Sequence, residues 1–160
     1  MSAPVRLATA ADAATLRALI EAFRDQMGEA DPTGATLDAS LARVLADPHA
    51  AFPIAFGAGG EPLGYAQLRF RYSLWITGIE AHVDDFFGAA PARRRGVGRA
   101  LLRASIACAR ERGARLLALT TNERNEGALA LYRAAGFRAE KDRWRGGRQL
   151  WLELPLEEVL

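Results

Sequence analysis

Cysteine is almost absent from this 160-residue sequence, which contains only Cys108. A single cysteine excludes a disulfide within the chain and a cysteine-based zinc site, and it agrees with a reducing compartment. Long apolar runs are also lacking, because Arg6, Asp12 and Arg17 interrupt the N-terminal segment. We therefore expect a cytoplasmic protein with no export signal, no membrane partner and no metal.

Lysine is equally scarce, since Lys141 is the only one among 21 basic residues. The net charge is only +2, but four arginines cluster at positions 93, 94, 95 and 99. A nucleic-acid-binding surface would be expected to have aromatic residues interleaved with the basic ones, and this cluster has none. The clustering indicates a local phosphate ligand and no nucleic-acid partner.

Hydrophobic residues make up half of the sequence and charged residues a quarter, as in ordinary globular proteins. A chain of this length can bury roughly 70% of the surface that its unfolded form exposes. Neither repeats nor linkers interrupt it. We expect a single domain over residues 1–160.

Hydrophobic periodicity predicts the order of helices and strands. Apolar residues recur at helical spacing in four segments, and with a period of two in several others. The predicted helices cover residues 12–25, with Met27 continuing the apolar stripe, and residues 36–46, 98–112 and 125–135. The predicted strands cover residues 5–8, a meander over 52–87, 115–120, and two strands after Phe137, the last over 149–154. Early local pairing followed by alternation with helices predicts a mixed sheet with helices on both faces.

The first motif that carries chemistry is the arginine-glycine segment 93–98, between a predicted strand and a predicted helix. A helix N-terminus offers unpaired N–H groups, glycine lets a ligand approach the backbone, and arginine binds phosphate. These features predict a pyrophosphate site. Dinucleotide-binding and ATP-binding motifs do not fit the glycine spacing. Taken alone, the segment is equally compatible with a basic turn that starts a helix.

The second motif runs from Asn125 to Phe137 and includes Ala128, Tyr132 and Gly136. Asn125 can cap a helix, and Tyr132 follows seven residues later on the same face. Taken alone, the pair is compatible with a capping asparagine and a core tyrosine.

The two motifs together resemble the GNAT superfamily of acetyl-CoA-dependent N-acetyltransferases. Arg93, Gly96 and Gly98 match its phosphate-loop pattern, and the segment 125–137 matches its second pattern. The resemblance implies an α/β (α+β) fold with a mostly antiparallel sheet of six to seven strands, an acyltransferase activity, acetyl-CoA as cosubstrate and a homodimer. The segment 83–87 is similar to the diamine and polyamine acetyltransferase branch, although Asp84 and Gly88 depart from that branch's usual residues.

The resemblance also implies which residues contact acetyl-CoA. The end of the strand before the arginine loop would pair with the pantetheine arm and donate a backbone N–H to the oxyanion. The loop and helix start would bind the pyrophosphate, and the second motif would hold the rest of the cofactor. The implied cofactor-binding residues are Phe86, Phe87, Gly88, Arg93, Arg94, Arg95, Gly96, Val97, Gly98, Arg99, Asn125 and Ala128.

Alternation along the strand 80–87 predicts Glu80, His82, Asp84 and Phe86 on one face and the intervening residues on the other. If the strand is central, such a polar face requires a cleft, water or a ligand. We interpret it as a substrate groove. An edge strand with a solvated face is the alternative.

Acetyl transfer to an alkyl amine requires that its proton be removed, because an amine with a pKa of about 10.4 is charged at neutral pH. Asp84 is the first candidate base, with Glu80 or His82 as alternates or relay. The resemblance gives Tyr132 the role of acid toward the coenzyme A sulfur. Core packing is the favoured role of Cys108, so we expect direct transfer in a ternary complex.

Tyr72, Trp75 and Glu80, together with His82, are the candidate substrate residues, since aromatic and acidic groups suit a cationic amine. We expect the acceptor to be a polyamine, a diamine or an amino acid. A protein or peptide N-acetyltransferase is an alternative with the same cofactor machinery. A non-catalytic acetyl-CoA-binding sensor is an alternative from another class.

Overall fold

The computed structural model describes residues 3–90, 96–139 and 150–156, and it divides into two compact units, residues 1–120 and 121–160. The first unit contains a six-stranded sheet. Its strands are β1 (Val5–Leu7), β2 (Ala50–Ala51), β3 (Pro53–Phe56), β4 (Pro62–Ser73), β5 (Gly78–Gly88) and β6 (Ala114–Leu119).

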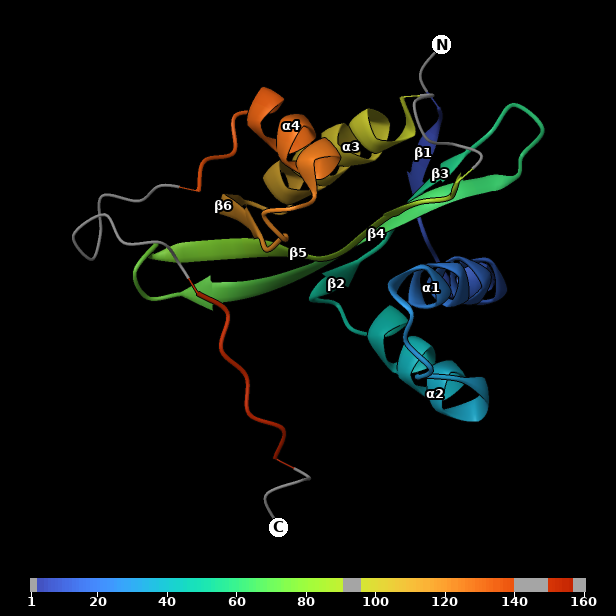
Figure 1. The fold of residues 1–160 in the computed structure, drawn as a ribbon. Coiled ribbons are helices and arrows are strands. Elements are labelled where there is room, and N and C mark those ends of the chain that lie inside the picture. The colour runs from blue at the N-terminus through green and yellow to red at the C-terminus, as the bar shows by residue number, and fades with distance from the viewer. Residues whose placement is uncertain (1–2, 91–95, 140–149, 157–160) are drawn as a thin grey trace. The chain divides into compact units, whose positions relative to one another are not determined.

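The strand order is β1-β3-β4-β5-β6, and β2 pairs with β4 beside β3. Every pairing is antiparallel except that of β5 with β6, which is parallel. The long β4–β5 hairpin forms the centre of the sheet (Figure 1). The predicted mixed, mostly antiparallel sheet is therefore confirmed.

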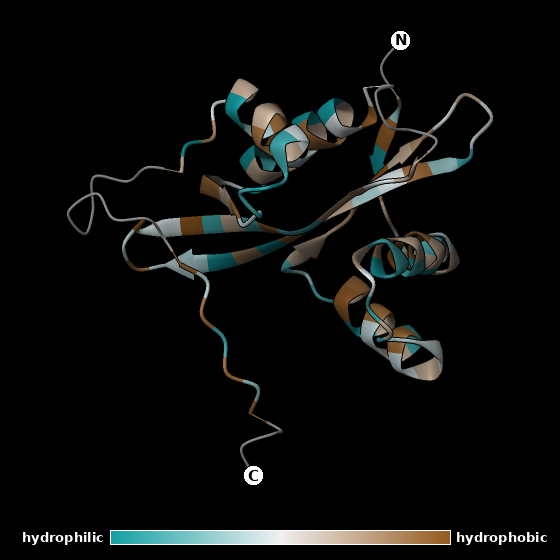
Figure 2. Cartoon of the chain, viewed as in Figure 1, coloured by the Kyte–Doolittle hydropathy of each residue, from teal (hydrophilic) through white to brown (hydrophobic). Residues whose placement is uncertain are grey.

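Helices cover both faces of this sheet (Figure 1). The helices α1 (Ala13–Met27) and α2 (Gly34–Leu45) lie on one face, after a short 3-10 turn at Ala10–Asp12. The helix α3 (Val97–Glu111) lies on the other face. The predicted helices at residues 12–25, 36–46 and 98–112 are confirmed within two residues at each end. Figure 2 shows hydrophobic and hydrophilic residues alternating around them.

Each face of the sheet has its own hydrophobic core. On the α1 side, buried residues of α1, α2, β3 and the central strands pack together: Leu16, Leu19, Leu41, Phe52, Ile54, Tyr65 and Phe87. On the α3 side, Leu68, Phe70, Ala81 and Val83 pack against Cys108 and Ala109 of α3. Cys108 is 4% exposed, and burial raises the pKa of its thiol, which agrees with the predicted packing role.

A β-bulge interrupts the pairing of β4 with β5. Gln67 is opposite Asp85 and the next residue, Leu68, is opposite Val83, so Asp84 is the extra residue. The predicted strict alternation along β5 is therefore wrong beyond Asp84. Phe86 packs on the α3 side together with Val83, whereas Phe87 packs on the α1 side.

The hairpin extends past α1 and α2, so these helices cover only part of their face of the sheet (Figure 1). The covered part of β4 includes Tyr65, which is fully buried. Farther along, Arg69 and Arg71 project on the same face but are exposed. The change from an apolar to a charged face thus follows the end of the helix cover.

The second unit contains one described helix, α4 (Glu126–Ala134), as predicted for residues 125–135. Its N-cap is Asn125, whose Oδ1 accepts a hydrogen bond from the Ala128 N–H at 3.3 Å. Gly136 follows the helix at a φ of 96°, a conformation that favours glycine.

The predicted C-terminal strand is not observed at its described residues, since residues 150–154 belong to no strand. Leu150, Trp151 and Leu152 are each more than 70% exposed. Alternating apolar residues form a strand only when a neighbouring strand satisfies their backbone groups, and the sequence does not specify that neighbour.

Candidate functional site

A ladder of charged residues covers the face of the β4–β5 hairpin beyond α1 and α2. We define this open face by Arg69 and Arg71 of β4 and Glu80, His82 and Asp84 of β5. The register pairs Arg69 with His82 and Arg71 with Glu80. Side chains directly opposite each other in an antiparallel pair are close enough to form ion pairs. The structure thus brings together the three polar residues predicted for this strand.

Asp84 is held by two basic side chains of the open face. The Arg69 guanidinium donates to its Oδ2, and the Nδ1 of His82 lies 2.9 Å from its Oδ1. The Asp84 side chain is 22% exposed, whereas that of Arg69 is 63% exposed. Both carboxylate oxygens of Asp84 are therefore already engaged within the fold.

Glu80 is paired in the same way, because the Arg71 Nη2 donates to its Oε2 at 3.1 Å. The Glu80 side chain is 13% exposed and that of Arg71 is 76% exposed. Exposed pairs of this kind contribute little to stability. Their arrangement matters more for ligands, since an incoming cation competes with an arginine for each carboxylate.

Asp85 lies on the same face of the sheet as Asp84, because the bulge lets two consecutive residues project to one side. Its Oδ2 accepts a hydrogen bond from the Tyr65 hydroxyl at 3.0 Å. Burial raises the pKa of the Asp85 carboxyl, the Tyr65 hydrogen bond opposes this shift, and the negative charge of Asp84 adds to it. Two neighbouring carboxylates thus have different surroundings.

Aromatic rings fix the position of the Tyr65 hydroxyl. The Tyr65 ring packs against Phe23 of α1 at a centroid distance of 6.4 Å and against Phe87 of β5 at 6.3 Å. Phe23 and Phe87 are themselves stacked at 5.2 Å. Burial raises the pKa of Tyr65, so its hydroxyl stays protonated and remains a donor to Asp85.

The last residues of β5 extend beyond the end of its pairing with β6. The parallel ladder with β6 ends at the pair Val83 and Leu119, whereas β5 continues to Gly88. This stretch contains Phe86, Phe87 and Gly88, the residues predicted to pair with the pantetheine arm. A sheet whose strands separate in this way can accept an extended ligand by strand-like pairing.

Part of the segment predicted to bind phosphate lies at the N-terminus of α3. Gly96 is the N-cap with a φ of 78°, and a Cβ built there would meet no atom within 4 Å. Val97 is buried against Leu63 and Leu101, which anchors the first turn. Gly98 and Arg99 follow in the same turn. Arg93, Arg94 and Arg95 lie outside the described residues.

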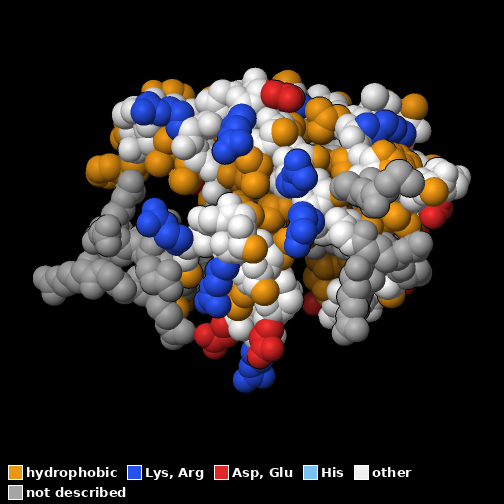
Figure 3. Space-filling view, turned by 90° about the horizontal axis from the view of Figure 1, so that it is seen from above, with side chains coloured by type: hydrophobic (Ala, Val, Ile, Leu, Met, Phe, Trp, Pro, Cys, Tyr) orange, Lys and Arg blue, Asp and Glu red, His pale blue; other side chains and the backbone are white. Residues whose placement is uncertain are grey.

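Basic residues also mark the exposed side of α3. Arg99, Arg103 and Arg110 are exposed along the helix. Figure 3, which views the molecule from this side, shows basic side chains as separate groups on the surface.

In the second unit, Tyr132 is 7% exposed, and its ring lies 5.9 Å from that of Phe137. Burial raises the pKa of the Tyr132 hydroxyl, which keeps it protonated and able to donate. Asn125 and Ala128 form the helix cap described above. The geometry of these residues is compatible both with the predicted cofactor roles and with a purely structural motif.

Two predicted substrate residues are not brought to the open face. Tyr72 is opposite Ile79, and the alternation of β4 puts it on the face of Phe70, away from Arg71. Trp75 lies in the turn at the tip of the hairpin and is 82% exposed. The sequence shows that aromatic residues lie near the tip of the hairpin, but the face of the sheet to which they project depends on the register of β4 against β5.

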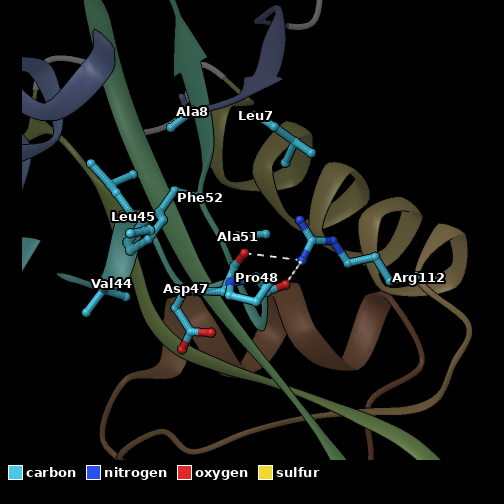
Figure 4. Close-up of a pocket in the computed structure, with 11 residues that line it drawn as sticks. Leu7, Ala8, Val44, Leu45, Asp47, Pro48, Ala51, Phe52 and Arg112 are labelled. Atoms are coloured by element: carbon cyan, nitrogen blue, oxygen red, sulfur yellow. Dashed lines mark hydrogen bonds between the residues drawn. The ribbon is translucent and has the colours of Figure 1, made fainter. Parts of the chain in front are cut away.

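A cavity of about 250 Å³ lies elsewhere in the first unit, between β1, the end of α2, β2 and Arg112 (Figure 4). The Arg112 Nη1 donates to the backbone oxygens of Pro48 and Ala50, at 3.1 and 3.2 Å. None of the predicted site residues lines this cavity. Most of its lining residues are apolar, its one guanidinium donates to backbone oxygens, and its one carboxylate, that of Asp47, accepts a hydrogen bond from the His49 N–H.

Within the described part of the chain, no helix is long and apolar enough to cross a membrane. The same residues contain no group of histidine, cysteine and acidic side chains that could hold a metal ion.

Three functional candidates were not identified from the sequence: Asp85, Tyr65 and Arg69. The sequence does carry a signal for the first, because Asp84, Asp85, Phe86 and Phe87 in succession do not fit strict alternation. The partners Tyr65 and Arg69 depend on the register of β4 against β5 and leave no such signal.

A model of the acetyltransferase (GNAT) family matches residues 16–137 of this chain. The aminoglycoside N(6')-acetyltransferase type 1 of Stenotrophomonas maltophilia is 32% identical over 121 residues, which are 73% of this chain and 74% of that protein. The streptothricin acetyltransferase of Streptomyces lavendulae is 32% identical over 119 residues, 74% of this chain and 57% of that protein.

The fold has close counterparts among solved structures. AAC(6')-Iy in complex with the bisubstrate analog CoA-S-monomethyl-acetylneamine superimposes with a TM-score of 0.76 at 20% identity, over 97% of this chain and 99% of that one. At 20% sequence identity, this similarity establishes a shared fold.

Proposed function

This chain belongs to the acetyltransferase (GNAT) family, and from that membership we propose that it transfers an acetyl group from acetyl-CoA to a primary amine of a small cationic molecule. The observation that carries the choice of acceptor is the open face, where Glu80 and Asp84 are held by exposed arginines. An ammonium group that approaches this face finds carboxylates paired with exposed arginine side chains, with which it can compete.

The relatives agree with a cationic acceptor. One is named for an aminoglycoside and another for streptothricin, both of which are small molecules that carry amines. We therefore place aminoglycoside-like amines beside the polyamines, diamines and amino acids expected from the sequence. The narrower similarity to the diamine and polyamine branch rests on the segment 83–87 alone.

The fit of acetyl-CoA to this chain rests on two features of the first unit. The end of β5 beyond Val83 has the extended backbone needed to pair with a pantetheine arm. The α3 N-terminus has open space at Gly96 and the N–H groups of a first turn, which suit a pyrophosphate. Phe86, Phe87, Gly88 and residues 93–99 are the proposed contacts, together with Asn125 and Ala128.

The proposed chemistry requires a proton acceptor for the amine and a proton donor for the departing thiolate. A carboxylate of the bulge is the proposed acceptor, a role for which the sequence favours Asp84. Tyr132 is the proposed donor, since its hydroxyl is kept protonated by burial. Both compact units belong to one acetyltransferase domain in this proposal, because the family model spans residues 16–137. A cytoplasmic homodimer completes it.

The test is release of free thiol from acetyl-CoA in the presence of single amines. The panel contains spermidine, putrescine, arginine, an aminoglycoside, a streptothricin and a lysine-containing peptide. Wild type is compared with Tyr132→Phe, which removes only the hydroxyl, and with Asp38→Asn, a control for an exposed carboxylate paired with Arg17. We expect turnover with a small cationic amine, a loss of about tenfold or more in Tyr132→Phe, and no loss in the control.

Other outcomes would select a different function. Turnover with the peptide alone would favour a protein or peptide N-acetyltransferase. Coenzyme A binding that raises the melting temperature, without turnover of any amine, would favour a sensor.

A further inference from the structure

The two aspartates of the bulge, Asp84 and Asp85, differ in the hydrogen-bond partners of their carboxylates. Asp84 accepts from Arg69 at its Oδ2, and the His82 Nδ1 lies 2.9 Å from its Oδ1, so each of its oxygens already has a partner. Asp85 accepts one hydrogen bond, from the neutral Tyr65 hydroxyl to its Oδ2. No hydrogen bond to its Oδ1 is formed by the residues that the structure describes. Among the described residues, the Asp85 Oδ1 therefore remains available to accept a proton, whereas both oxygens of Asp84 already have partners.

The position of Asp85 along β5 also favours it. Asp85 lies beyond Val83, where the ladder with β6 ends, and it directly precedes Phe86. The bulge projects its side chain to the α1 side, next to Tyr65 and Phe87. If the acetyl thioester lies along this end of β5, as in the proposed function, Asp85 is the nearer of the two carboxylates in sequence.

We propose that Asp85 is the catalytic base of the reaction and that Tyr65 is a positioning residue which fixes the Asp85 carboxylate. This inference rests on the proposed function, which supplies the amine and the acetyl-CoA. Asp84, with Glu80, then has the separate task of attracting the ammonium group to the open face.

The ammonium group of the substrate gives one proton to the Asp85 carboxylate and becomes a neutral amine. Its lone pair forms a C–N bond with the thioester carbonyl carbon, and the C–S bond breaks. The departing coenzyme A sulfur takes a second proton from the same nitrogen, through Tyr132 in the proposed function, so the amide keeps one. Asp85 then releases its proton to water.

The surroundings of Asp85 are suited to a base. Burial and the charge of Asp84 both raise the pKa of its carboxyl, which makes the carboxylate a better proton acceptor than an exposed aspartate. The titratable groups that act on it are Tyr65 of β4 and Asp84 of β5, the latter paired with Arg69 and His82. From α1, the element packed against Tyr65, the neutral Phe23 ring faces the pair.

The experiment compares Asp85→Asn, Asp84→Asn and Tyr65→Phe in the full chain, with the amine that wild type acetylates best. We expect Asp85→Asn to lower kcat by about a hundredfold or more, as for loss of a general base. Asp84→Asn should raise KM with less than about a tenfold change in kcat. Melting temperatures and coenzyme A binding show whether each variant is folded.

Tyr65→Phe tests the positioning role through the pH profile of kcat/KM, which would not shift if Tyr65 were only a packing residue. Its hydrogen bond stabilises the charged form of Asp85, so its removal raises the Asp85 pKa further. The acid limb of the pH profile of kcat/KM should therefore shift to higher pH in Tyr65→Phe. This readout also applies if Asp85→Asn fails to fold.

Retention of kcat in Asp85→Asn, together with its loss in Asp84→Asn, would overturn the inference. An unchanged acid limb in Tyr65→Phe would overturn the positioning role. If wild type itself acetylates no amine, the proposed function fails and the base assignment fails with it. Turnover by wild type that survives Asp85→Asn contradicts only the assignment.

Discussion

The covered and the open parts of the β4–β5 hairpin differ in what their side chains do. In the covered part, Tyr65 is fully buried between the sheet and α1, where it packs against Phe23. In the open part, Arg69 and Arg71 extend over acidic residues of β5. The bulge at Asp84 lies at the boundary, so this face of the strand changes from buried packing to exposed ion pairs within a few residues. Stability should therefore depend on the first part and substrate binding on the second.

The largest effect on stability is expected from a buried position on β3, in the core that also contains Tyr65 of the covered part. Ile54 is fully buried, and Ile54→Ala should lower the free energy of unfolding by about 2–5 kcal/mol because a cavity remains. Arg71→Ala, in the open part, should change it by less than about 0.5 kcal/mol. Urea denaturation followed by circular dichroism measures both, and equal losses would remove the distinction between the two parts.

A second pair of variants compares two glycines on facing strands. A side chain at Gly64 would collide with the Phe87 carbonyl oxygen, whereas one at Gly88 would meet no atom within 4 Å. Gly64→Ala should therefore cost about 1–3 kcal/mol, through separation of β4 from β5. Gly88→Ala should have little effect on the same denaturation curve. A Gly64→Ala variant as stable as wild type would show that the close approach is not required.

The covered part was also the more predictable one. The spacing of Leu16 and Leu19 predicts α1, and alternation along β4 predicts its two faces, because burial imposes a fixed period on a regular element. The motif at Asn125 correctly predicts a capped helix. Periodicity describes regular structure, so it performs best where the chain is regular.

The bulge could not be placed in the same way, and alternation assigned Phe86 to the wrong face. An extra residue in a strand depends on the register with its partner, which a single sequence does not contain. The ion pairs of Asp84 and the hydrogen bond of Asp85 depend on the same register. Alternation therefore groups Glu80, His82 and Asp84 correctly on one face of β5, but it does not identify their partners on β4.

The pH dependence of stability provides a third comparison, within the first unit. Arg6 and the Thr9 N–H hold the pKa of Asp12 well below its usual value. The carboxylate therefore contributes stability above its ordinary pKa of about 4, and this contribution is lost as pH falls toward the folded-state pKa.

Asp12→Asn should lower the urea midpoint at pH 7, and the difference from wild type should shrink toward pH 2–3. Asp38→Asn is the control, since the Asp38 side chain is 51% exposed. A difference that stays constant over this pH range would contradict the role of the Asp12 charge.

The smallest effect is expected from Arg69→Gln in the open part. Loss of this exposed partner leaves the Asp84 carboxylate more accessible to a cationic substrate. KM for the amine should fall by up to about fivefold, as for an exposed ion pair worth roughly 0.2–1 kcal/mol. Steady-state kinetics with the preferred amine measures it. An increase in KM would indicate that Arg69 itself binds the acceptor.

The most direct test of the account is an NMR titration of the full chain with coenzyme A, in which backbone amide shifts report where the ligand binds. The account predicts shifts at Phe86, Phe87 and Gly88 and at the first turn of α3 around Val97. Shifts confined to the cavity beside Phe52 and Arg112 would contradict it, because the cosubstrate would then bind away from the bulge and its two carboxylates.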